Sequence, residues 1–134
     1  MNRSKNDLIN YRLFRAKDTL DDAHILAEKQ KWNSAINRIY YAAYYAVMAL
    51  LLDADLHPTT HNGAKSNFSE HFIKTNLFDK EYGKMYSQLF SWRQKGDYDD
   101  LFDFSREKVE PYFEPVAKML ELIEKKLKDK NAEP

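Results

Sequence analysis

Apolar residues spaced four and three apart constrain the fold of this chain more than any other feature. Two segments, one near each end, carry apolar residues at steps of 4, 3, 4, 3 and 4, the period of one face of an α-helix. The first series is Ile9, Leu13, Ala16, Leu20, Ala23 and Ala27, and the second is Val109, Phe113, Val116, Leu120, Ile123 and Leu127. Only 3 glycines and 4 prolines occur in 134 residues, so helices are favoured throughout.

The segment WNSAINRIYYAAYYAVMALLLDADL, residues 32–56, is apolar on nearly every side. It predicts a central helix packed by several neighbours, with Asn33 or Ser34 as its N-cap. A small bundle is expected to bury only part of this surface, which predicts a homodimer. No run approaches the length of apolar sequence that a membrane span needs, so no membrane association is predicted.

Two shorter helices are predicted between the central and the final one. Phe68 and Phe72, at i and i+4, mark the core side of a third helix. A fourth helix is predicted over about residues 79–95. Its core-facing stripe comprises Tyr82, Tyr86, Leu89 and Arg93.

Prolines modify the final helix, and short connections set the topology. Pro111 and Pro115 predict that this helix either begins late, near Glu110, or is kinked. Short links between consecutive helices favour antiparallel neighbours. The sequence therefore predicts an all-α, up-and-down bundle of about five helices. We expect one domain over residues 1–134, with its core at about 7–127 and a frayed tail at 128–134.

Composition restricts the function classes. With 21 basic and 21 acidic residues the formal charge is zero, so any site for nucleic acid must be local. The chain has no cysteine, which excludes disulfides and thiolate metal sites. His57 and His61 are four apart, but Pro58 lies between them and further ligands would have to come from elsewhere, so neither a metal nor a cofactor is predicted. The N-terminus lacks the apolar segment of a signal peptide, and a cytoplasmic protein is expected.

The stretch LFSWRQKGDYDD, residues 89–100, places a cationic side chain at the end of the core-facing stripe of the fourth helix. Arg93 precedes Asp97 by four residues, and Tyr98 follows. One interpretation is a helix end capped by Gly96 with an incidental surface ion pair. The other is an anion-binding or catalytic arginine, held by Asp97 and bordered by the Tyr98 hydroxyl, because a guanidinium suits phosphate.

The stretch HPTTHNGAKS, residues 57–66, opens the third helix. If the third and fourth helices are antiparallel, this opening lies beside the end of the fourth helix. His61 and Lys65 would then share one rim with Arg93. Amide donors at the start of a helix favour an anion there.

Three motifs, taken together and in order, carry a family resemblance. They are YYAAYYAVMALL in the second helix, THNGAKSNFSEHFI opening the third and RQKGDYD closing the fourth. Over about residues 7–127 the chain resembles the HEPN domain family of prokaryotes. That resemblance implies a bundle of four or five helices that pairs as a homodimer, and many members are encoded beside minimal nucleotidyltransferases as toxin partners. Active branches cleave RNA without a metal, using an arginine followed four to six residues later by a histidine.

This chain departs from the family pattern at the histidine. Arg93 stands at the family arginine, but no histidine follows it, and Asp97 and Tyr98 occupy that region. A carboxyl group beside an arginine has a lowered pKa and is a poor general acid. The sequence therefore resembles a branch whose RNase activity is absent or uses different groups.

Three functions follow from these observations. The first is a nucleotide- or RNA-binding partner of a minimal nucleotidyltransferase in a toxin–antitoxin-type system, with Arg93, His61 and Lys65 as binding residues. The second is a metal-independent endoribonuclease that uses Arg93, Asp97 and Tyr98, with His61 supplying the imidazole. The third is a structural helical adaptor without a site.

Overall fold

Helices account for the ordered architecture, as the apolar spacing predicts. The computed structural model describes residues 4–98 and 102–132, and the side chains of 4–95 and 102–129. No strand occurs in these described residues, and the all-α bundle is confirmed. Its elements are α1 (Lys5–Glu28), α2 (Trp32–Asp53), α3 (His61–Phe68), a π-helical turn η1 (Ser69–Ile73), α4 (Lys80–Tyr98), α5 (Arg106–Val109), a 3-10 turn η2 (Glu110–Tyr112) and α6 (Phe113–Ala132).

Local hydrogen bonds fix both ends of α1. At its start the Asp7 amide donates to the Ser4 hydroxyl at 3.1 Å, and the Ser4 amide donates to the Asp7 carboxylate at 3.3 Å, a capping box. At its end Gln30 adopts a left-handed φ of 59°, and the Lys31 amide donates to the Leu26 carbonyl at 2.9 Å. The chain reverses at once, and α2 returns along α1.

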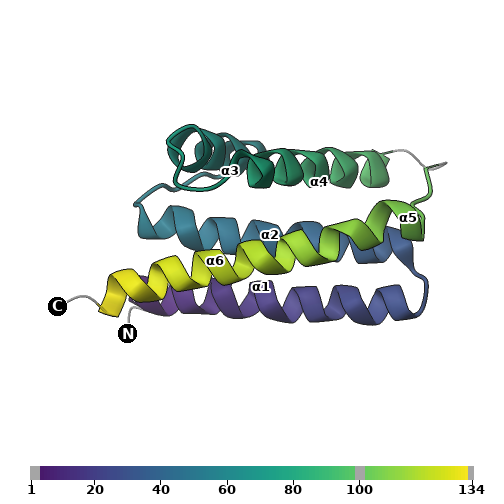
Figure 1. Ribbon diagram of the computed structural model, residues 1–134, viewed down its shortest axis with the longest axis horizontal. Coiled ribbons are helices and arrows are strands. Elements are labelled where there is room, and N and C mark those ends of the chain that lie inside the picture. The colour runs from purple at the N-terminus through teal and green to yellow at the C-terminus, as the bar shows by residue number, and fades with distance from the viewer. Residues whose placement is uncertain (1–3, 99–101, 133–134) are drawn as a thin grey trace.

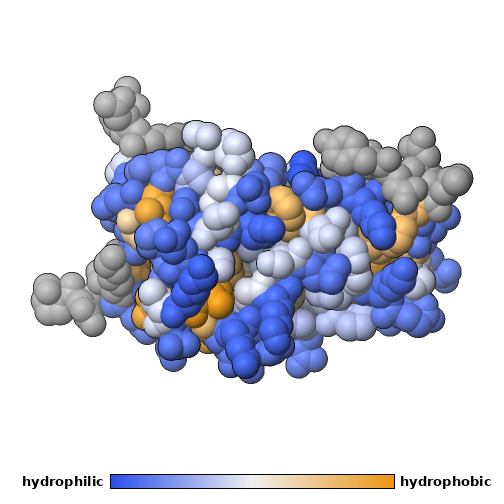
Figure 2. Space-filling view, turned by 90° about the horizontal axis from the view of Figure 1, so that it is seen from above, coloured by the Kyte–Doolittle hydropathy of each residue, from blue (hydrophilic) through white to orange (hydrophobic). Residues whose placement is uncertain are grey.

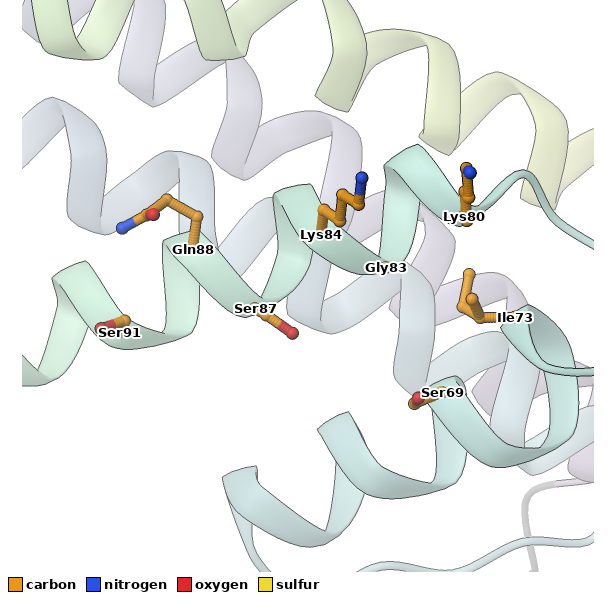
Figure 3. A pocket seen from close by; sticks show the side chains of 8 residues that line it. All are labelled: Ser69, Ile73, Lys80, Gly83, Lys84, Ser87, Gln88 and Ser91. Carbon is orange, nitrogen blue, oxygen red and sulfur yellow. The ribbon is translucent and has the colours of Figure 1, made fainter.

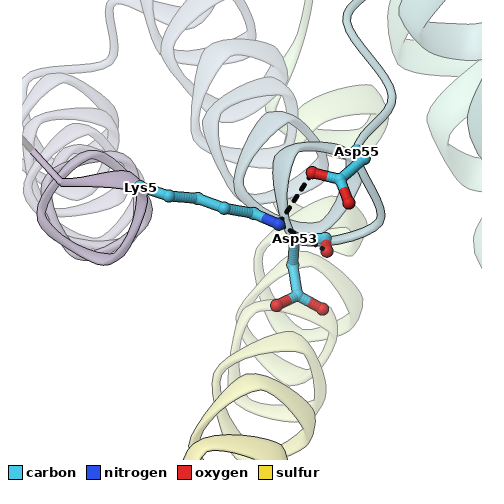
Figure 4. Close-up of polar contacts among 3 residues, drawn as sticks. All are labelled: Lys5, Asp53 and Asp55. Atoms are coloured by element: carbon cyan, nitrogen blue, oxygen red, sulfur yellow. Dashed lines mark hydrogen bonds and ion pairs between the residues drawn. The ribbon is translucent and has the colours of Figure 1, made fainter.

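Lys5 fastens the other end of this helical hairpin. Its ammonium group donates to the Asp53 carbonyl at 3.2 Å and to the Asp55 carboxylate at 2.8 Å (Figure 4). The start of α1 is thereby held against the end of α2. Because the pair is largely exposed, we expect it to contribute no more than about 1 kcal/mol.

The centre of the bundle is α2, which lies between the α1–α6 pair and the α3–α4 pair (Figure 1). Its buried side includes five alanines, which let neighbouring helices approach closely: Ala35, Ala42, Ala43, Ala46 and Ala49. By length and composition alone α2 would also suit a membrane span, at a mean hydropathy of 1.2, but 67% of that window is buried inside the bundle. A single chain thus covers most of α2, which removes the argument from excess apolar surface for a homodimer.

The predicted cap of α2 is wrong. Lys31 occupies the N-cap position and makes no side-chain capping bond. Asn33 instead receives the Phe104 amide on its side-chain oxygen at 2.8 Å and donates to the Asp103 carboxylate at 3.3 Å. The amide side chain of Asn33 therefore ties the start of α2 to the segment that leads into α5.

The observed ends of two helices differ from the predicted ones. The helix α4 was predicted to end near residue 95, but it continues through Gly96 to Tyr98, so Gly96 is not a C-cap. The final helix is interrupted as its prolines predict, with Pro111 in η2 between α5 and α6. The segment expected to fray is helical as far as Ala132.

A close crossing joins η1 to α4. A Cβ atom on Gly83 would meet Ile73 side-chain atoms at 3.1 and 3.2 Å, so glycine allows the two elements to approach. Beside this crossing lies an open groove of 510 Å³, lined by serines of η1 and α4 and by Lys80 and Lys84 (Figure 3). The face seen from above is mostly hydrophilic, with small separate apolar patches (Figure 2).

Candidate anion-binding site

One stripe of α2 is left half-buried while most of its other positions are buried. The stripe comprises Arg38, Tyr41, Tyr44, Tyr45 and Met48, at helical spacings that keep them on one face. Helix α1 borders this stripe on one side, and the start of α3 and the end of α4 border it on the other. We call these five residues the α2 stripe.

Arg93 reaches the α2 stripe from α4. Its Nε donates to the Tyr41 hydroxyl at 3.2 Å. Its guanidinium carbon lies 5.6 Å from the ring centres of both Tyr40 and Tyr41, a cation–π arrangement. The arginine follows Tyr86 and Leu89 on the core-facing side of α4, which explains why it is half-buried and why its head group is held by aromatic rings.

His61, the first residue of α3, meets the same aromatic group. Its ring stacks on Tyr44, with centres 4.4 Å apart, and its Nδ1 lies 2.8 Å from the Tyr40 hydroxyl. The Thr60 hydroxyl caps α3 by receiving the Gly63 amide at 2.9 Å, so the helix start holds the ring in place. Burial, and then the charge of Arg93, lower the pKa of His61, so the imidazole is neutral at pH 7.

Tyr40 orients the His61 ring. Burial raises the pKa of Tyr40 far above its ordinary value, so its hydroxyl keeps its hydrogen and can donate it to Nδ1. The Tyr86 hydroxyl is buried beside it without a hydrogen bond of standard geometry. When Tyr40 donates to Nδ1, the proton of the neutral His61 ring sits on Nε2, which is then a donor.

Three further arginines adjoin the α2 stripe. Arg15 donates to the Tyr45 hydroxyl at 3.2 Å and lies 5.1 Å from that ring. Arg12 donates to the Met48 carbonyl at 3.0 Å. Arg38 lies 5.0 Å from the Tyr41 ring and donates to the side-chain oxygen of its neighbour Asn37 at 2.7 Å. All of these acceptors are neutral.

The structure brings together some of the residues that the sequence singled out. His61 and Arg93 converge on Tyr40 and Tyr41. Lys65 points instead over the Phe90 ring, 4.4 Å from its centre. The side chains of Asp97 and Tyr98 lie outside the described residues.

Sequence reasoning missed the arginines of α1 and α2, and it assigned no binding role to the tyrosines of α2. One signal was available: Arg38, Tyr41 and Tyr45 follow the helical step. The histidine pair does not meet, because His57 is exposed ahead of α3. Among the described residues, no three carboxylate or histidine side chains are grouped as metal ligands.

Comparison with known proteins gives one family. The model of the HEPN domain matches residues 9–127. A UPF0332 protein of Thermotoga maritima is 40% identical over 125 residues, which cover 93% of this chain and 95% of that protein.

Two archaeal relatives carry a functional name. Both are proteins of Methanocaldococcus jannaschii named "Putative toxin". One is 33% identical over 96 residues, covering 72% of this chain and 65% of that protein. The other is 32% identical over 83 residues, covering 62% of each. The matched region thus spans under two thirds of either toxin-named protein.

Proposed function

Because this chain belongs to the HEPN domain family, we propose that it is a cytoplasmic toxin–antitoxin protein whose Arg93–His61 site binds the phosphate of a nucleotide or RNA without cleaving it. The toxin names of two relatives support the first part of this proposal. The site itself supports the second part.

The observation that carries the proposal is the convergence of His61 and Arg93 on one aromatic group. The guanidinium of Arg93 and the Nε2–H of His61 belong to different helices and share the Tyr40–Tyr41 rings. Together they offer a cation and a neutral donor, which suits a phosphate oxygen. Tyrosine rings beside them offer stacking surface to a base.

The tautomer of His61 favours binding over cleavage. Metal-free cleavage of RNA needs a group that accepts the 2′-hydroxyl proton. In the tautomer in which Tyr40 donates to Nδ1, Nε2 carries the proton and His61 has no free lone pair for that task. The ring can hold a phosphate but cannot act as a general base in this arrangement.

The enzyme-class rival is a metal-independent endoribonuclease. One observation favours it: His61 is neutral at pH 7 and lies beside Arg93, as a base in such an enzyme would. Rotation of the ring away from Tyr40 would free Nδ1. The rival is therefore tested with the same RNA.

Partners form the remaining part of the proposal. We propose that the protein forms a homodimer and associates with a minimal nucleotidyltransferase, as the family resemblance implies. Exposed apolar side chains on α1, Phe14 at 60% and Ile25 at 53%, are available for such contacts. Sedimentation should give twice the chain mass of 15.9 kDa, and a small nucleotidyltransferase encoded next door should co-purify on co-expression. A stable monomer that does not co-purify with such a partner would contradict the proposed homodimer and the proposed association.

The site is tested with a single-stranded RNA oligonucleotide in the presence of chelator. We expect binding without cleavage, and Arg93→Gln should weaken binding at least about tenfold, the usual effect of losing a hydrogen bond to a charged group. Arg106→Gln, an arginine far along the chain that also lies over an aromatic ring, is the matched control and should have no effect. Cleavage that His61→Ala stops would establish the rival. Equal binding by all variants would favour the third function, a structural helical adaptor without a site.

A further inference from the structure

Resting on the proposed function, we propose that the ligand is a single-stranded RNA several nucleotides long, which runs from the Arg93–His61 site along the α2 stripe to Arg12 and Arg15 of α1. The proposal concerns the three arginines that sequence reasoning missed. We call Arg12, Arg15 and Arg38 the arginine strip.

Contacts connect the strip to the site without a break. The Tyr45 ring, which Arg15 overlies, has its centre 6.2 Å from that of Tyr41. Tyr41 in turn receives Arg93 on its hydroxyl and Arg38 on its ring. The cations therefore line one continuous aromatic surface, with α1 at one end and the α3–α4 corner at the other.

The partners of the strip set it apart from the cations of this protein that pair with a carboxylate. Lys5, Lys17 and Arg106 each pair with a carboxylate. Among the described residues, Arg12, Arg15 and Arg38 form no ion pair; their acceptors are a carbonyl, a tyrosine hydroxyl and an amide oxygen. Asp18 acts on Arg15 only beyond ion-pair distance. A chain with equal numbers of acids and bases has thus left one row of guanidinium groups unneutralised.

The length of the strip selects a polymer over a mononucleotide. From Arg38 to Met48, whose carbonyl receives Arg12, α2 rises about 15 Å at 1.5 Å per residue. A stacked strand carries one phosphate per roughly 3.4 Å and an extended strand carries fewer, so the strip matches at most about four phosphates. A single nucleotide would reach only the Arg93–His61 end.

Charge and exposure favour RNA over another protein surface. A second copy docked here would bring two rows of guanidinium groups into one interface, and neither the strip nor the α2 stripe contains a carboxylate to pair with them. An acidic protein would satisfy the charges but would not need exposed rings. Tyr11, four residues before Arg15, is 48% exposed and offers a face for a base to stack on.

The experiment measures the affinity of the full chain for a 12-nucleotide oligouridylate and for uridine monophosphate over a range of salt. The variants are Arg12→Gln/Arg15→Gln, Arg38→Gln, Arg93→Gln and the control Arg106→Gln, each checked by thermal unfolding. Arg38→Gln loses only the hydrogen bonds to its neighbour's amide and the contact with the Tyr41 ring, so it remains informative if the double variant is destabilised. We expect the oligomer to bind more tightly than the monomer. The double variant should lower the slope of log affinity against log salt by about 1.4, and Arg38→Gln by about 0.7, for the oligomer alone.

Each outcome separates the strip from the site. If Arg93→Gln weakens both ligands while the strip variants behave like Arg106→Gln, the strip proposal fails and the proposed function stands. If the strip variants weaken binding of the oligomer and Arg93→Gln does not, the proposed Arg93–His61 site is wrong and the strip proposal is supported. No binding of the oligomer overturns both, and binding of polyglutamate instead assigns the strip to an acidic partner.

Discussion

Two clusters of arginine and aromatic side chains in this molecule differ in their partners: a carboxylate pairs with Arg106 in one, whereas neutral acceptors hold the arginine strip beside the other. At the start of α2, the guanidinium of Arg106 lies 5.5 Å from the Trp32 ring and pairs with Glu110 at 3.9 Å, and His24 stacks on Phe113 at 4.2 Å. We call this the distal cluster; it lines a hollow of 430 Å³.

The second cluster, around Tyr40 and Tyr41, places His61 half-buried with one nitrogen held by a hydroxyl. It continues into the arginine strip, where neutral acceptors hold the cations. Residue types alone therefore do not make an anion-binding site. What matters is whether the protein supplies the counter-charge itself and whether buried groups fix the orientation of the donors.

Removal of the Tyr40 hydroxyl should have the largest effect. Tyr40→Phe removes the hydrogen bond to His61 Nδ1 and leaves that part-buried nitrogen without its partner, at a cost of about 1–3 kcal/mol. Urea denaturation measures this loss. The control Tyr45→Phe removes a half-exposed hydroxyl that water can replace, and should cost less than about 1 kcal/mol. Equal losses would mean that the Tyr40 hydroxyl does not fix His61.

A carboxylate introduced beside the arginine strip should pair with one of its arginines, as Glu110 pairs with Arg106 in the distal cluster. Glu110 stands four residues after Arg106, and Tyr11→Glu would place an acid four residues before Arg15, the favourable orientation on a helix. We expect RNA affinity to fall by about fivefold to tenfold, since one cation is neutralised and one stacking ring is lost. Tyr11→Gln, which removes the ring without adding charge, should lose less. If both variants lose equally, charge is not the deciding factor.

The success of sequence reasoning differed between fold and site for a physical reason. Apolar steps of four and three report burial, which is a property of one helix at a time, and they predicted α1, α4 and α6 closely. Asn33 failed as a cap because a distant segment, at Asp103 and Phe104, competes for its side chain. No local pattern contains that contact.

The site shows the same limit. Arg93 and His61 could be paired because antiparallel helices bring their ends together. Arg12 and Arg15 could not, since an arginine on a helix surface looks the same in sequence whether its partner is a carboxylate or a hydroxyl. Only the three-dimensional structure shows that their partners are neutral.

His61 should make the stability of the folded protein depend on pH. The pKa of His61 is lowered in the folded state by burial and by Arg93. Below about pH 7, His61 is therefore protonated to a greater extent in the unfolded chain than in the folded chain. The free energy of unfolding should therefore decrease as the pH falls through the ordinary histidine value of 6.5 and level off below the lowered one. His61→Gln should flatten this dependence, as measured by urea denaturation across the pH range. A profile that is unchanged in His61→Gln would contradict the lowered pKa of His61.

The smallest effect is expected from the distal cluster itself. Glu110→Gln removes the carboxylate of Arg106, an exposed pair whose loss should change stability by less than about 1 kcal/mol. If self-neutralisation is what disqualifies this cluster, the freed guanidinium should add one weak phosphate contact, and the salt slope for RNA binding should steepen by at most about 0.7. Glu114→Gln, an exposed acid in the first turn of α6, controls for the change in net charge. A slope that steepens equally in both variants would mean that overall charge, and not the pairing of Arg106, separates the two clusters. A slope unchanged in both would mean that a guanidinium also needs the oriented hydroxyl and imidazole of the Tyr40–His61 region to hold a phosphate.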